Sequence, residues 1–207
     1  MTATRRNFIA LSTAGMAAAT FSPLAHAATP PTTLVKPPLL GDANAPKRLV
    51  LFGSYTCVFT AALVGMLIPM VTDLKGKVSV EWRHFPAHPP DPALHVAGLA
   101  FKDAHFWNFM LSVMRVVYAA NGAYTDLTPE KLAEFAKIEG GSTKTLEAAY
   151  ADKAKWTAVK QDLMAGKLLG ITRTPGVFHN GYFLTPNGIP TDLKAFDKSL
   201  RGMIAKG

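Results

Sequence analysis

The chain has 207 residues, of which 49% are hydrophobic and 17% are charged. This composition excludes a disordered chain, a collagen-like repeat and a coiled coil, and it suits one globular domain with an insertion. The 22 basic residues outnumber the 14 acidic ones, which gives a formal net charge of +8. Because this excess is spread thinly rather than gathered in a basic block, we expect no nucleic-acid partner.

Residues 1–27 have the layout of an export signal. Arg5 and Arg6 precede a weakly apolar run, and the stretch ends in small residues up to Ala27. This order is typical of a signal peptide, and the adjacent arginines resemble a twin-arginine signal. We therefore expect cleavage near Ala27 and a periplasmic protein whose mature chain has no membrane span.

Residues 28–46 are rich in proline and turn-forming residues, which predicts an N-terminal tether outside the core. The apolar run 47–53 predicts a buried strand, and the alternation of apolar and polar residues over 77–85 predicts a second strand. Between them, the helical spacing of apolar residues over 58–74 predicts a crossover helix, which Pro69 is expected to kink. A crossover helix favours parallel pairing of the two strands.

The segment 91–169 is expected to be a helical insertion. Its helices are expected at 92–101, 105–118, 129–139 and 144–165. After Gly170 the pattern changes, and strands at 176–179 and 182–184 are expected to form a hairpin through the tight turn Asn180-Gly181, before a closing helix over 191–205. These elements predict an α/β fold, with helices on both faces of a sheet.

Cys57, the only cysteine, lies where the first predicted strand gives way to the crossover helix. In an oxidising compartment an unpaired thiol is expected to be either buried or used. The free N–H groups and partial positive charge of a helix N-terminus stabilise a thiolate, so the position favours a reactive sulfur. A small buried structural cysteine is the alternative.

Several stretches together resemble the DsbA family of thioredoxin-like thiol-disulfide oxidoreductases. They are GDANAP at 41–46, KRLVLFGSYTC ending at Cys57, VSVEWRHFP at 78–86, Phe106-Trp107, and TRTPGVF at 172–178. The resemblance spans roughly residues 40–205. It implies a thioredoxin-like fold built from residues 47–90 and 170–207, with the helical insertion 91–169 between them.

The resemblance also implies a site. Members of the family exchange disulfides through a Cys-x-x-Cys pair beside a loop with a cis-proline. By position, Cys57 matches the attacking cysteine, and Thr174-Pro175 match the loop. The residues expected to contact substrate are Tyr55, Thr56, Val58, Phe59, Thr174 and Pro175.

The chain departs from the family pattern at Thr60, which stands where the second cysteine would be. With one cysteine, the chain cannot form an internal disulfide. Single-thiol exchange stays possible: Cys57 attacks a disulfide, and an external thiol partner releases the adduct. Thr60 either offers its hydroxyl to the thiolate, as a second catalytic residue, or is left from a lost redox function.

The histidines do not suggest a metal site. His84 and His88 are four residues apart, but Pro86 between them prevents a shared helical face. The sequence has no glycine-rich phosphate loop and no Gly-x-Ser-x-Gly element. We therefore expect neither a metal nor a cofactor.

Three functions remain open. The first is an exported single-thiol exchange protein that acts as a reductase, an isomerase or a remover of small-thiol adducts, with protein thiols or disulfides, or small thiols, as partners. The second is a non-catalytic peptide-binding chaperone or adaptor on the same fold. The third is a glutathione-dependent transferase or isomerase. No pattern in the sequence indicates an oligomeric state.

Overall fold

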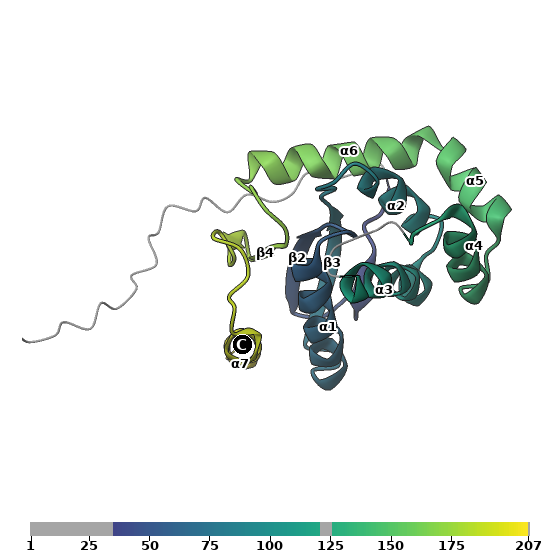
Figure 1. The fold of residues 1–207 in the computed structure, drawn as a ribbon. Helices are drawn as coiled ribbons and strands as arrows, with labels where there is room; N and C mark the ends of the chain where they lie inside the picture. Colours follow the sequence, from purple (N-terminus) through teal and green to yellow (C-terminus); the bar gives the residue numbers. More distant parts are fainter. Residues whose placement is uncertain (1–34, 121–125, 207) are drawn as a thin grey trace, which may run out of the picture.

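The computed structural model describes residues 35–120 and 126–206, which form one five-stranded sheet and seven helices (Figure 1). The expected leader 1–27 and its cleavage near Ala27 lie outside the described residues. The strands are β1 (Leu39–Gly41), β2 (Lys47–Gly53), β3 (Val78–His84), β4 (Gly176–His179) and β5 (Tyr182–Phe183). The helices are α1 (Val58–Asp73), α2 (Asp91–Gly98), α3 (Asp103–Ala119), α4 (Pro129–Ile138), α5 (Thr143–Ala151), α6 (Lys153–Leu168) and α7 (Leu193–Ala205).

The sheet has the order β1-β3-β2-β4-β5. β2 and β3 are parallel, with Leu51 opposite Trp82, and α1 connects them, so the predicted crossover is confirmed. β4 pairs antiparallel with β2 and with β5, which confirms the hairpin. Its turn places Asn180 and Gly181 at φ angles of 49° and 76°, the positive region that Asn and Gly tolerate best.

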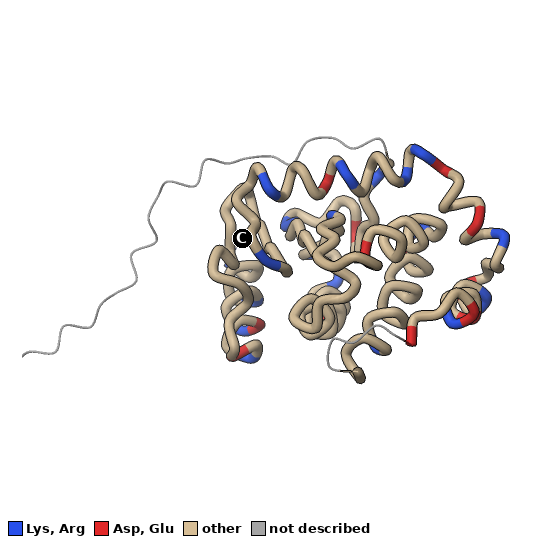
Figure 2. The backbone as a smooth tube through the Cα atoms, turned by 45° about the horizontal axis from the view of Figure 1, so that its top comes forward, with Lys and Arg blue, Asp and Glu red and all other residues tan. Residues whose placement is uncertain are grey.

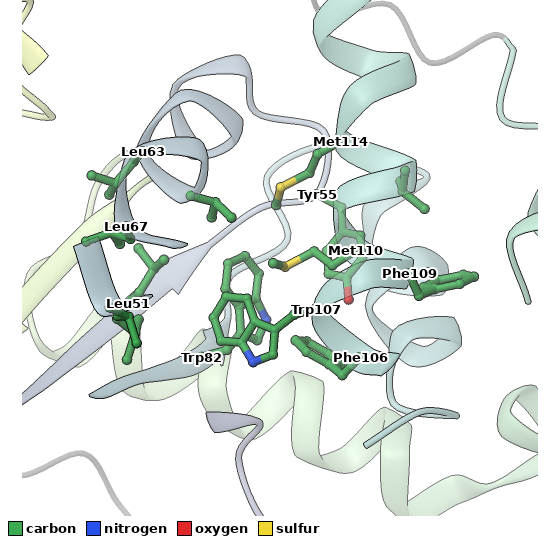
Figure 3. Close-up of a cluster of buried hydrophobic side chains, with 14 of the residues drawn as sticks. Leu51, Tyr55, Leu63, Leu67, Trp82, Phe106, Trp107, Phe109, Met110 and Met114 are labelled. Atoms are coloured by element: carbon green, nitrogen blue, oxygen red, sulfur yellow. The ribbon is translucent and has the colours of Figure 1, made fainter. Parts of the chain in front are cut away.

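The alternation of side chains along β2 divides the core into two layers. Leu49 and Leu51 point into the larger cluster, which lies against α1 and α3. Phe52 points to the opposite face, where a smaller cluster with Phe85 and Phe178 lies under α6. Figure 3 shows the larger cluster, in which side chains of α1, β2, β3 and α3 meet around Trp82. The sheet is therefore buried on both faces, as the apolar runs predicted.

Helix α1 is continuous from Val58 to Asp73 and contains Pro69. Its buried residues Leu63, Leu67 and Met70 recur at the spacing of one helical face. This packing against the sheet fixes the start of the helix. It thereby fixes the position of Cys57, which lies between the end of β2 and Val58.

Two features differ from the sequence expectations. The segment 28–46 was expected to be a tether, but Leu39–Gly41 within it forms β1 at the edge of the sheet, antiparallel to β3. A short edge strand pairs through its backbone groups and needs no alternating apolar pattern, so the proline-rich composition of this segment did not indicate it. The helix expected over 144–165 is two helices, because the carboxylate of Asp152 accepts a bond from the N–H of Ala154 and starts α6.

Helix α6, the last helix of the segment expected to be an insertion, packs against β3 and covers one face of the sheet (Figure 1). Of the described residues, no helix has both the length and the apolar character needed to cross a membrane.

Candidate active site around Cys57

Cys57 is the N-cap residue of α1 and follows the loop at the end of β2. The side chain is half-buried, so its sulfur is partly open to solvent. The thiol donates to the backbone oxygen of Thr174, at 3.5 Å, across 117 residues of sequence. The fold therefore brings the cysteine and the loop implied by the resemblance into contact.

The Thr174–Pro175 peptide bond is cis, as the resemblance implied. Both residues are buried, with Thr174 exposed to only 8%. The hydroxyl of Thr185 donates to the oxygen of Pro175, at 3.2 Å, and accepts from the N–H of Val177, at 3.0 Å. Thr185 thus positions the loop, and the sequence analysis missed it because a threonine after a short strand has no distinctive pattern.

Tyr55 and Thr56, which were expected to contact substrate, have side chains that lie in the interior. The Tyr55 side chain is fully buried, and its ring packs edge-on against Trp82, with 5.8 Å between ring centres. Burial, followed by the nearby Asp91, raises the pKa of the Tyr55 hydroxyl well above its usual range. Thr56 is exposed to 2% and bonds to Nδ1 of His88 at 2.7 Å. Both side chains therefore contribute to the buried side of the site.

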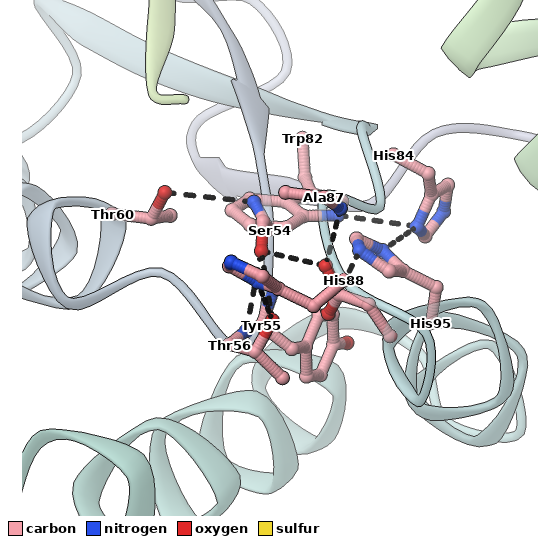
Figure 4. A network of polar contacts seen from close by, with 10 residues as sticks. Ser54, Tyr55, Thr56, Thr60, Trp82, His84, Ala87, His88 and His95 are labelled. Atoms are coloured by element: carbon pink, nitrogen blue, oxygen red, sulfur yellow. Dashed lines mark hydrogen bonds and ion pairs between the residues drawn. The ribbon is translucent and has the colours of Figure 1, made fainter. Parts of the chain in front are cut away.

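The carboxylate of Asp91, at the start of α2, organises this buried side of the site. Figure 4 shows the network of polar contacts to which Ser54, Ala87 and His95 belong. The Asp91 carboxylate accepts from the Ser54 hydroxyl at 2.6 Å, from the N–H of Tyr55 at 3.0 Å and from the N–H of Ala87 at 2.8 Å. Nε2 of His95 lies 3.6 Å away. Burial raises the pKa of Asp91, but the charge of His95 and these bonds outweigh it and leave the pKa below its usual value.

A pair of buried histidines extends the network. The indole N–H of Trp82 donates to Nδ1 of His84 at 3.3 Å, and Nδ1 of His95 lies 2.8 Å from the same atom. Because the indole can only donate, Nδ1 of His84 accepts, and Nδ1 of His95 carries the proton. Burial, followed by the charges of His95 and Arg83, lowers the pKa of His84 well below its usual value. His84 is therefore neutral, whereas His95 faces the carboxylate of Asp91.

From the sequence, His84 and His88 were weighed as metal ligands and expected instead to be surface or locally hydrogen-bonded histidines, and Asp91 was not singled out. In residues 35–120 and 126–206, no three or more His, Cys, Asp or Glu side chains are grouped so as to hold a metal ion. A usable signal was Asp91 at the first position of a helix, after two prolines, where an acidic side chain can reach the backbone of a neighbouring loop.

The helical side of the thiol is open. Val58 is half-buried, and Phe59 is 59% exposed. Both line an apolar cavity of about 580 Å³, whose far wall comes from Tyr118 of α3 and from Ile189 and Leu193. Two of the predicted substrate contacts therefore border a cavity that begins at the residue after the cysteine.

Thr60 lies one turn along α1 and is fully buried. Its hydroxyl accepts from the N–H of Ser54 at 3.5 Å. The hydrogen bonds of the described residues include none between this hydroxyl and the sulfur of Cys57. Thr60 thus connects α1 to the loop that carries the buried network.

The sequence and the fold were compared with known proteins. Residues 33–198 match the family described as Thioredoxin. BdbD from Bacillus subtilis, oxidised, is 21% identical with a TM-score of 0.66, over 83% of this chain and 94% of that one. The thiol-disulfide exchange protein alpha-DsbA2 from Wolbachia pipientis is 18% identical, with a TM-score of 0.61, over 81% and 87%. ScsC from Proteus mirabilis is 19% identical, with a TM-score of 0.63, over 83% and 74%. No curated protein matches the chain.

These findings agree with the observed architecture. The family match runs from before β1 into α7 and includes both Cys57 and Thr174. The mixed α/β fold, with its helices between β3 and β4, matches the solved DsbA-like structures, so the predicted fold class is confirmed. The chain belongs to the thioredoxin family.

Proposed function

We propose that the protein exchanges disulfides through the single thiol of Cys57. The observation that carries this proposal is the half-exposed sulfur at the start of α1, 3.5 Å from the backbone oxygen of Thr174. The N–H groups of a helix start stabilise a thiolate, and the thiolate is the nucleophile in exchange. Thr174 and Pro175 would border the substrate on one side of the sulfur, and Val58 and Phe59 on the other.

The reaction needs an external thiol. The Cys57 thiolate attacks one sulfur of a substrate disulfide, forms a new disulfide with it, and releases the other sulfur as a thiolate. Because the chain has one cysteine, a second thiol from outside must attack the adduct and restore the Cys57 thiolate. The same two steps serve a reductase, an isomerase or a remover of small-thiol adducts, depending on the disulfide presented. Thr60 would support the first step by fixing the loop before Cys57 through Ser54.

The test is turnover of a peptide mixed disulfide by the full chain with an added thiol. The Cys57→Ser variant is expected to lose turnover to the uncatalysed level while it keeps the folding stability of the unaltered chain. Cys57→Ser combined with Lys144→Cys supplies a matched control with one thiol at an exposed position on another helix. Full turnover by that control, or by Cys57→Ser alone, would contradict the proposal.

We also propose export to the periplasm, with the leader 1–27 removed near Ala27. The support is the sequence pattern of paired arginines, apolar run and small-residue end. Expression of the full chain in a Gram-negative host, followed by sequencing of the N-terminus of the periplasmic fraction, tests it. A full-length chain found only in the cytoplasm would contradict it.

A second candidate function is peptide binding without exchange. It is favoured by a second apolar cavity of about 460 Å³ between α1 and α3, which shares Ala62 and Tyr118 with the cavity beside Phe59. Continuous apolar surface of this kind suits extended peptides. The Cys57→Ser variant separates the two functions. Binding alone is favoured if this variant suppresses client aggregation as well as the unaltered chain does, and if the unaltered chain shows no turnover.

A further inference from the structure

A different cavity is lined by Thr172, Arg173 and Thr174 of the loop that contacts Cys57. Its volume is about 480 Å³, and apolar side chains line part of it: Phe85, Leu163 and Ile171. Thr174 lines it as well, and the backbone oxygen of Thr174 is the atom that accepts from the Cys57 thiol. One residue, Thr174, therefore both lines the cavity and contacts the candidate nucleophile.

The charged side chains that line this cavity are both basic. Lys167 comes from the end of α6, and Arg173 directly precedes Thr174. Both residues are exposed, and the ion pairs of the described residues do not include either of them. Basic residues recur along α6 (Figure 2), and Lys167 is the last of them.

The acidic groups near this cavity already have partners. Asp162 of α6 pairs with Arg83 at 3.0 Å, and its other oxygen accepts from the N–H of His84. Asp91, which bonds to the N–H of Ala87 in the cavity wall, faces His95. Both carboxylates are buried, so neither is free to bind Lys167 or Arg173. The cavity is left with two uncompensated positive charges.

The cavity beside Phe59 has no charged lining residue. Val58, the residue after Cys57, lines this apolar cavity, whereas Thr174, which accepts from the Cys57 thiol, lines the cationic one. We propose that the cationic cavity binds the carboxylate of a small acidic thiol while that thiol is joined to a protein as a mixed disulfide. This inference rests on the proposed exchange function and names its substrate class.

The orientation determines which sulfur is attacked. With the small thiol held by Lys167 and Arg173, the Cys57 thiolate attacks the sulfur of the small thiol. The bond between the two substrate sulfurs breaks, the protein sulfur leaves as a thiolate, and a disulfide forms between Cys57 and the small thiol. A second molecule of the small thiol, as its thiolate, then attacks that disulfide, giving the oxidised small-thiol dimer and the free Cys57 thiolate.

The test compares two adducts of one peptide. One carries glutathione, an anionic thiol, and the other carries cysteamine, a cationic one; the same resolving thiol is used for both. We expect the unaltered chain to show kcat/KM about fivefold to tenfold higher for the glutathione adduct, since two solvent-exposed charge contacts supply modest energies. The double variant Lys167→Gln and Arg173→Gln should bring the ratio to about twofold or less. Lys160→Gln, an exposed position on the same helix outside the cavity, should leave the ratio unchanged.

The outcomes separate the inference from the proposed function. Equal rates on the two adducts, or an unchanged ratio in a folded double variant, overturn the cationic cavity as a binding site and leave exchange standing. An absence of turnover with either adduct overturns the exchange function and this inference with it. Thermal unfolding of the double variant verifies that it folds, and the two exposed side chains are not expected to affect stability.

Discussion

The residues on the two sides of Cys57 belong to different environments. Ser54, Tyr55 and Thr56, before the cysteine, are buried and bonded directly or indirectly to Asp91. Val58 and Phe59, after it, border an open apolar cavity. Sequence proximity to a reactive residue therefore does not by itself define a substrate site. One side fixes the position of the sulfur, and the other side is accessible to a partner.

The largest expected effect comes from Asp91→Ala. The change leaves the Ser54 hydroxyl and the N–H groups of Tyr55 and Ala87 without their acceptor, and His95 without its carboxylate. We expect a loss of about 3–5 kcal/mol in the free energy of unfolding, as for other broken buried pairs. Denaturant unfolding measures it, with Glu147→Ala, an exposed acidic position, as the control. A loss below about 1 kcal/mol would show that the buried side does not depend on Asp91.

A smaller effect is expected from Gly98→Ala. A Cβ at Gly98 would meet the hydroxyl of Tyr55, which has no hydrogen-bond partner among the described residues. We expect a loss of about 1–3 kcal/mol from overpacking. Tyr55→Phe removes the obstructing oxygen, so the double variant should recover most of that loss.

Tyr55→Phe alone tests whether the hydroxyl of this residue takes part in exchange. Since the side chain is buried, the variant should exchange disulfides at the unaltered rate and keep or slightly gain stability. Additive effects in the Gly98→Ala double variant would show that the Tyr55 hydroxyl is not the obstructing group. A slower exchange in Tyr55→Phe would place that hydroxyl in the site after all.

The pH dependence of stability tests the histidine pair. His84 takes up a proton near pH 6.5 in the unfolded chain, but its lowered pKa keeps it neutral at that pH in the folded chain. Between the pKa of His84 in the folded chain and its pKa in the unfolded chain, the unfolded state binds more protons. Stability therefore falls as the pH drops below about 6.5. The groups that face His84 are His95, Arg83 and, through its backbone N–H, Asp162.

His84→Gln should therefore flatten the decline in unfolding free energy between pH 7 and pH 5. Denaturant unfolding at a series of pH values measures the slope. His105→Gln is the control, because the side chain of His105 is 64% exposed. An equal decline in His84→Gln and in the unaltered chain would assign the slope to other groups.

The sequence predicted the parts of this molecule that depend on local pattern. The apolar run 47–53 predicted β2, and alternation predicted β3. Asn180-Gly181 predicted the hairpin, and the position of Cys57 between strand and helix placed the thiol. The contact between Cys57 and Thr174 was expected only through the family resemblance, since the two are 117 residues apart.

The parts that were missed depend on long-range contacts. Asp91 acts on Ser54 and Tyr55, which lie 37 and 36 residues away, and no periodicity encodes such a contact. β1 has three residues and owes its existence to the neighbouring β3. The burial of Tyr55 was unpredictable for the same reason, because an aromatic residue in a loop suits a groove and a core equally well.

The smallest effect on stability is expected from Phe59→Ala, on the open side of Cys57. The side chain is 59% exposed, so its removal should change the free energy of unfolding by less than about 0.5 kcal/mol. Exchange should respond differently, since Phe59 lines the cavity that an apolar peptide would occupy. We expect a several-fold rise in KM for an apolar peptide disulfide and an unchanged KM for a small hydrophilic one, measured with the same resolving thiol. If the KM of each substrate is the same for Phe59→Ala as for the unaltered chain, substrates approach Cys57 without using the cavity. The open side would then only expose the sulfur.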